Sequence, residues 1–296
     1  MNFSLGCSLV YRVKSPTPFV FNFEAARFDA QTVQEERLQL IPKTSIERWT
    51  MPESGNRYLR ILAEPGEFRV RYEAEVELSP RLEDPDAVTE ISAGQLPFEV
   101  LTHLYPSRYC QSDKLVRFAG RTFRDLPPGY HRVNGVCNWI RDNVDYVLGS
   151  SDLLTSAFDT VTQRIGVCRD FAHLGMALCR ALGIPARYVS AYAWRLDPPD
   201  FHAVFEAFLN GPSGAGWYLF DPTRMSAPDG LVRIGLGRDA AEVAFCTAYE
   251  EVESDAPQVW ISGDGDATGP ITTSAVRTET QPASRSATPT TSDARP

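Results

Sequence analysis

The chain has 296 residues and a net charge of −9, so it is long enough for one large domain or two modest ones with a buried core. The acidic balance argues against nucleic acid or an anionic membrane as a partner. No apolar run approaches the roughly 18 to 20 residues that a membrane helix needs. The first residues show neither a basic segment nor a long apolar segment, so we expect no signal peptide and a cytoplasmic location. Six cysteines without a CxxC pair are expected to be reduced thiols.

Residues 1–95 predict a β-rich N-terminal domain. Segments 7–13, 37–42 and 57–62 have strand-like lengths and apolar content. Segment 67–78 alternates most clearly, because one face would carry only Phe68, Val70, Tyr72, Ala74, Val76 and Leu78. A small antiparallel sandwich or open barrel fits this pattern. No catalytic grouping occurs there, so we interpret the domain as a structural or substrate-guiding module.

Residues 96–262 are expected to form a catalytic domain that is followed by a disordered tail. Helical spacing begins after residue 129, with apolar residues at Val133, Val136, Cys137, Ile140 and Val144. Residues 263–296 are rich in Gly, Ser, Thr, Pro and Ala. Such a segment buries too little surface to offset its ordering entropy, which predicts disorder over 263–296.

A second helix is predicted to begin at or just after Cys168. Helical spacing links Phe171, Leu174, Leu178 and Leu182, and residues 183–185 (Gly-Ile-Pro) supply a stop signal. Asp170 falls in the first turn, where a negative charge is favourable. A helix N-terminus favours the thiolate, which makes Cys168 a candidate nucleophile. We expect Gly166 to let the backbone approach a substrate closely and Cys179 to be core.

His202 and Asp221 are the candidate partners of that thiol. Residues 186–194 and 202–209 read as strands, and a loop at 210–216 leads into a strand at 217–220 that ends at Asp221. A tight turn at 211–212 would set His202 directly opposite Asp221, whereas a wider loop would displace them by about three residues, roughly 10 Å. Cys at a helix start, His at a strand start and Asp at a strand end form a pattern typical of a catalytic triad.

Four segments resemble the bacterial transglutaminase-like superfamily: GVCRDFA at 166–172, ALCRALGIPARYV at 177–189, FHAVFE at 201–206 and WYLFDPT at 217–223. In that family the matching Cys is the nucleophile, the His is its base and the Asp orients the His. The resemblance therefore implies Cys168, His202 and Asp221 as catalytic residues. It also implies an α+β fold, with a papain-like core whose nucleophile helix packs on an antiparallel sheet.

The resemblance implies acylation of Cys168 by the carbonyl of a peptide, protein or amide substrate, with release of an amine. We expect hydrolysis of the resulting thioester. Transfer to an amine, as in a protein-glutamine transglutaminase, is one alternative. A non-catalytic scaffold or binding protein of the same fold is another, although such proteins usually lose one of the three residues, and this chain keeps them all.

No cofactor and no metal are expected. A zinc site made of Cys168, His173, Cys179 and His202 is disfavoured because its spacing matches none of the closed structural patterns. The Cys168 N–H and one side chain should stabilise the oxyanion, and Tyr146 and Gln163 are candidates for that side chain. Further candidates for lining the cleft are Tyr192, Trp194 and Trp217, although aromatic residues in strands are more often core.

Overall fold

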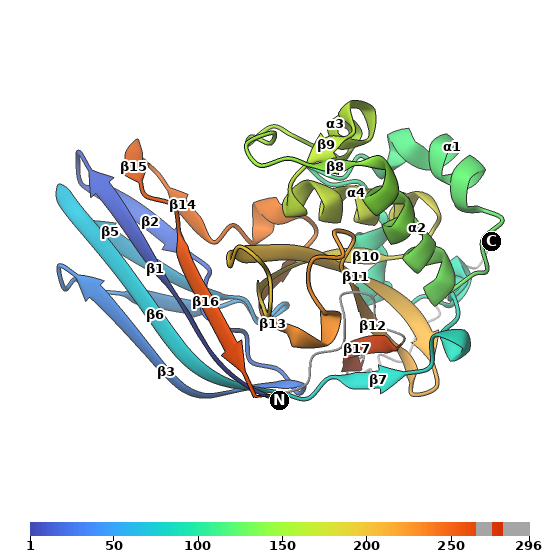
Figure 1. Cartoon of the computed structure of the whole chain (residues 1–296), viewed down its shortest axis with the longest axis horizontal. Helices are drawn as coiled ribbons and strands as arrows, with labels where there is room; N and C mark the ends of the chain where they lie inside the picture. The colour runs from blue at the N-terminus through green and yellow to red at the C-terminus, as the bar shows by residue number, and fades with distance from the viewer. Residues whose placement is uncertain (265–273, 281–296) are drawn as a thin grey trace, which may run out of the picture.

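The first strands of the chain form a two-sheet β-sandwich in the computed structural model, which describes residues 1–264 and 274–280 (Figure 1). One sheet has the strand order β15-β1-β6-β3, with β16 also paired to β1, and the other has the order β14-β2-β5-β4. The early strands are β1 (Asn2–Val13), β2 (Thr17–Phe21), β3 (Gln31–Ile41), β4 (Glu47–Thr50), β5 (Arg57–Ala63) and β6 (Gly66–Leu78). The β-rich N-terminal domain is therefore confirmed.

Strand β6 shows why this lobe folds as it does. Its even-numbered residues from Phe68 to Leu78 are all buried, whereas most of the residues between them are exposed. Because side chains alternate across a strand, this pattern places one continuous apolar face against the facing sheet. That sheet contributes Phe19, Phe21 and Ile61 to the same core cluster.

The second lobe is built on an antiparallel six-stranded sheet of order β13-β10-β11-β12-β17-β7. Figure 1 shows its helices gathered on one side of this sheet. The strands are β7 (Arg81–Glu83), β10 (Ala186–Ala193), β11 (Phe201–Gly211), β12 (Gly214–Phe220), β13 (Leu231–Gly237) and β17 (Ala275–Thr280). The α-helices are α1 (Ser112–Phe123), α2 (Tyr130–Asn143), α3 (Ala157–Gln163) and α4 (Cys168–Ala181). The α+β class is thus confirmed.

The remaining elements are short. A parallel pair, β8 (Asp145–Tyr146) and β9 (Ile165–Gly166), lies beside α3 and α4. The 3-10 helices are Pro85–Ala87, Ala93–Gln95, Phe98–Leu104, Pro228–Gly230 and Ala240–Glu242. No helix within the described residues is both long and apolar enough to cross a membrane.

Helix α4 is the central element of the second lobe. Nearly all of its residues are buried, and it packs directly on β11. The contact is close because Gly175 has no side chain: a Cβ there would lie 2.5 Å from the Phe205 ring of β11. As predicted, α4 begins at Cys168, and Cys179 is fully buried.

The predicted domain boundary at residue 96 does not match the way the strands pair. Strands β14 (Cys246–Ala248), β15 (Val252–Ser254) and β16 (Gln258–Gly263) return to the N-terminal sandwich and pair with β2 and β1. Residues 96–262 therefore do not form a separate catalytic unit. These late strands are short and mostly half-buried or exposed, so their local sequence does not identify their partners.

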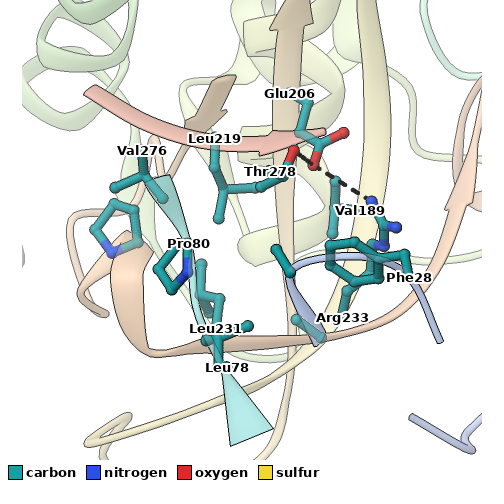
Figure 2. Close-up of a pocket in the computed structure, with 13 residues that line it drawn as sticks. Phe28, Leu78, Pro80, Val189, Glu206, Leu219, Leu231, Arg233, Val276 and Thr278 are labelled. Atoms are coloured by element: carbon teal, nitrogen blue, oxygen red, sulfur yellow. Dashed lines mark hydrogen bonds and ion pairs between the residues drawn. The ribbon is translucent and has the colours of Figure 1, made fainter. Parts of the chain in front are cut away.

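The predicted tail is wrong for residues 275–280, which form β17 between β12 and β7. Arg277 is 3% exposed and forms a buried ion pair with Glu83 of β7. Figure 2 shows Thr278 and Arg233 directed at Glu206, at one wall of a cavity of about 20 Å³ that has mainly apolar walls. The strand forms because the neighbouring strands supply its partners. The remainder of 263–296, beyond Asp264 and outside 274–280, lies outside the described residues.

Candidate active site

Cys168 is the first residue of α4 and is half-buried. The preceding residue, Val167, has an extended backbone and connects the short strand β9, which ends at Gly166, to the helix. The carboxylate of Asp170 accepts a hydrogen bond from the Val167 N–H at 2.9 Å, which satisfies one of the free donors at the helix start. The sulfur therefore lies at the positive end of a capped helix, where a thiolate is favoured.

Asp170 also ties the helix start to the segment before it. Its side chain is fully buried and accepts a hydrogen bond from the Ser151 hydroxyl at 3.0 Å. A Cβ at residue 166 would lie 2.8 Å from the Asp170 Cβ. Within the structure, Gly166 thus makes room for Asp170. This differs from the sequence-based interpretation, in which Gly166 makes room for a substrate.

His202 and Asp221 meet although the strand register does not set them opposite each other. His202 Nε2 lies 3.1 Å from Asp221 Oδ2. The hairpin pairs Gly211 with Gly214, so its turn lies at 212–213 and not at 211–212, the alternative that would have placed the two residues directly opposite. The strand register would place Asp221 opposite Val204, and the ladder ends at Phe205 and Phe220. The turn after β12 therefore brings the carboxylate to the imidazole.

His202 connects the thiol to the carboxylate. Its ring is almost fully buried, and the nearby Cys168 side chain contributes to its pKa. Burial lowers the pKa of His202, but the charge and hydrogen bond of Asp221, together with Cys168, raise it overall to about 10. The ring is therefore protonated near neutral pH, and Nε2 donates to Asp221. An imidazolium next to the sulfur favours the thiolate.

Asp221 is held by the turn that follows it. Its buried carboxylate accepts the N–H and hydroxyl of both Thr223 and Ser226, at 2.7 to 3.1 Å. Burial raises the pKa of Asp221, but the His202 charge and these donors lower it overall to about 2. The roles of Thr223 and Ser226 were not predicted from the sequence. An Asp followed two residues later by Thr is the signature of an Asx-turn, and it was the available signal.

Arg224 anchors the same turn to α2. Its φ of 57° lies in the left-handed region, which is uncommon for a residue with a side chain. Its guanidinium donates to the side-chain oxygens of Asn134 at 2.5 Å and Asn138 at 2.8 Å. The conformation is thus maintained by contacts with a helix, and Arg224 helps to fix the position of Asp221.

Of the two candidate oxyanion donors, Tyr146 is the one that lies beside the candidate nucleophile Cys168. Its hydroxyl is close to both the side chain and the backbone N–H of Cys168, and its ring packs 5.7 Å from the Phe171 ring. Burial and the Cys168 charge raise the pKa of Tyr146, so the phenol keeps its proton and remains a donor. Gln163 is exposed at the end of α3.

The three aromatic candidates for the cleft are buried. Tyr192 and Trp194 belong to the core of the N-terminal sandwich. Trp217 packs against Phe208 in a separate cluster. Within residues 1–264 and 274–280, no three His, Cys, Asp or Glu side chains are grouped so that they could hold a metal ion.

Comparison with known families gives two matches along the chain. Residues 1–99 match the bacterial transglutaminase N-terminal domain, and residues 116–222 match the transglutaminase-like superfamily. The second match contains Cys168, His202 and Asp221. The first corresponds to the strands of the sandwich up to β7 and the segment that follows.

A crystal structure from Cytophaga hutchinsonii, provisionally named a cysteine protease, is 40% identical. The two structures match over 94% of this chain and 97% of the Cytophaga chain, with a TM-score of 0.87. An uncharacterised protein of Mycobacterium leprae is 32% identical over 149 residues, and one of Mycobacterium tuberculosis is 29% identical over 161 residues. The alignments cover 48% and 51% of this chain, and 52% and 51% of those proteins. The chain therefore spans about half the length of the curated relatives it matches.

Proposed function

Because the chain belongs to the transglutaminase-like superfamily, we propose that it is a cysteine-nucleophile acyl-transfer enzyme that acts on amide or peptide bonds. The observation that carries the proposal is the position of His202, which is buried between the Cys168 thiol and the Asp221 carboxylate. A nucleophile, a proton carrier and a group that orients this carrier are the parts that covalent acyl transfer needs.

In the proposed reaction the Cys168 thiolate attacks the amide carbonyl carbon. The His202 imidazolium gives its proton to the departing amine, and a thioester on Cys168 remains. His202 then accepts a proton from water, and the hydroxide attacks the thioester and releases the acid. The leaving thiolate restores the ion pair with protonated His202. Throughout, Asp221 holds the ring in place and stabilises its charged form.

The oxyanion of each tetrahedral intermediate would be stabilised beside Cys168. The Cys168 N–H and the Tyr146 hydroxyl lie together at the thiol. We propose that the substrate oxygen accepts a hydrogen bond from both groups. Donors that are held in place before the reaction stabilise the developing charge without reorganisation.

We propose hydrolysis as the outcome, a choice supported by the provisional name of the Cytophaga relative. The test is to incubate the protein with dimethylated casein in the presence of dansylcadaverine. Hydrolysis of peptide bonds would release new amino groups, and transamidation would attach the fluorescent amine. The matched control is Cys168→Ala, which removes the nucleophile and leaves a smaller side chain. If neither product exceeds this control with casein or with small amides, the fold serves as a scaffold.

A further inference from the structure

The loop between β8 and α3 displays large apolar side chains on the surface of the protein. The exposed fractions are 74% for Leu148, 76% for Leu153 and 75% for Leu154, and Val147 is 42% exposed. Single exposed leucine side chains are common on protein surfaces. Several exposed apolar side chains within eight residues indicate a binding surface. We call residues 147–156 the apolar loop.

The apolar loop is attached to the residues that flank the nucleophile. The Val147 N–H donates to the Gly166 carbonyl at 3.0 Å. Arg169, the residue after Cys168, donates to the Ser151 hydroxyl at 2.7 Å and to the Asp152 carbonyl. Ser151 in turn donates to Asp170 at 3.0 Å. The loop therefore has a defined position relative to the thiol.

Most polar groups of this loop hydrogen-bond within the protein, although Asp152 itself is exposed. Asp152 is its only charged residue, and its carboxylate accepts from the N–H groups of Leu154 and Thr155 and from the Thr155 hydroxyl, at 2.8 to 2.9 Å. The Tyr109 hydroxyl binds the Leu153 carbonyl at 2.9 Å. An incoming molecule would therefore meet the exposed leucine side chains, next to a carboxylate that already accepts hydrogen bonds within the loop.

We propose that the apolar loop binds apolar side chains of a polypeptide substrate, next to the amide that Cys168 attacks. This inference rests on the proposed function. The loop follows directly after Tyr146, whose hydroxyl lies beside Cys168, and Arg169, the residue after Cys168, holds Ser151 and Asp152. Figure 1 shows the segment between β8 and α3 beside β9, and β9 ends two residues before Cys168, the first residue of α4. Because the loop is held by hydrogen bonds before binding, little ordering entropy opposes the contact.

The test uses two reagents with the same reactive group: iodoacetyl-Leu-Leu-amide and iodoacetyl-Ser-Ser-amide. In both, the thiolate displaces iodide and forms a thioether, so their ratio of rates at Cys168 reports only the preference for the apolar arm. Burial of one leucine side chain changes affinity by about tenfold or more. We expect a Leu-Leu preference of about that size in the unmodified protein.

Leu153→Ser combined with Leu154→Ser should bring this ratio close to one, and Leu148→Ser alone should lower it in part. The matched control is Phe98→Ser, since Phe98 is 89% exposed but lies in the 3-10 helix Phe98–Leu104, outside the apolar loop. Phe98→Ser should keep the full ratio.

Equal rates for the two reagents in the unmodified protein would overturn the inference. A second result would also overturn it: the leucine variants keep the Leu-Leu preference but lose a dimer that the unmodified protein forms in sedimentation experiments. The apolar loop would then contact a second copy of the chain and not the substrate. If Cys168 reacts with neither these reagents nor iodoacetamide, the proposed function itself fails. That outcome differs from the loss of a preference at a reactive thiol.

Discussion

The imidazole of His202 and the carboxylate of Asp221 lie 3.1 Å apart, although the paired residues nearest to them on β11 and β12 are Phe205 and Phe220. Strand β11 extends beyond this ladder to Phe201, whereas β12 ends at Phe220, and the turn held by Thr223 and Ser226 directs the carboxylate back to the ring. This pair therefore depends on the local turn chemistry of residues 221–226 and not on strand register.

We expect Asp221→Asn to fold and to lower the rate of amide cleavage by orders of magnitude, because the amide no longer stabilises the imidazolium. His202→Ala should be more severe, since the thiolate loses its proton carrier. The double variant should be little worse than His202→Ala alone, because nothing is left to orient. Values of kcat/KM for the four proteins provide the measurement, and losses that multiply in the double variant would show that Asp221 acts independently of His202.

Alkylation by iodoacetamide near pH 7 should be selective for Cys168. Burial raises the pKa of the Cys7, Cys110 and Cys137 thiols to about 12 and that of Cys246 to about 11. Burial also raises the pKa of Cys179. Cys168 is only half-buried and lies near His202. Peptide mapping by mass spectrometry should find one modified site in the folded protein and all six cysteines modified in guanidinium. Equal labelling of another cysteine in the folded protein would contradict the nucleophile assignment.

The stability of the protein should depend on pH through His202. Its pKa in the folded protein is about 10, above the usual 6.5, so the folded state binds the proton more tightly than the unfolded state does. This stabilisation is fully present below about pH 6.5 and is lost as the pH rises through about 10. Urea unfolding at pH 6, 8 and 10 should therefore show a falling difference between the protein and His202→Gln. A constant difference would mean that His202 is neutral in the folded state.

Tyr146→Phe should separate catalysis from thiol reactivity. Loss of one oxyanion donor typically lowers kcat by about 100- to 1000-fold. Alkylation by iodoacetamide forms no tetrahedral oxyanion, so labelling of Cys168 should continue in the variant. Gln163→Ala is a suitable control because Gln163 was the other candidate and is exposed. An unchanged kcat in Tyr146→Phe, or a large loss in Gln163→Ala, would exclude Tyr146 as the donor.

Arg277→Ala should destabilise the fold by about 3 to 5 kcal/mol, because Glu83 would keep a buried charge without its partner. The combined change of Glu83→Gln and Arg277→Met should recover part of this loss, since no unpaired charge remains. Arg81→Ala is the control: its side chain is exposed on the same strand as Glu83, so its effect should stay within about 0.5 kcal/mol. Urea unfolding gives all these values, and similar effects for Arg277 and Arg81 would contradict a structural role for β17.

Local patterns in the sequence were sufficient to predict several elements of this protein. The start of α4 at Cys168 could be predicted because helical spacing and a stop signal bound the helix within one short segment. The buried face of β6 could be predicted because alternation along one strand already separates its two sides. The same local signals bound the neighbouring helix and strands. They could therefore place Cys168, His202 and Asp221 at the ends of these elements.

Tertiary structure alone decided the rest. The turn at 212–213 and the hydrogen bonds of Thr223 and Ser226 to Asp221 set the distance to His202, and no periodicity encodes them. Strand β17 exists because β12 and β7 supply hydrogen bonds and Glu83 supplies a counter-charge. The return of β14, β15 and β16 to the first sandwich has a similar cause. Periodicity is a property of one segment, whereas strand pairing and burial depend on neighbours that are distant in the chain.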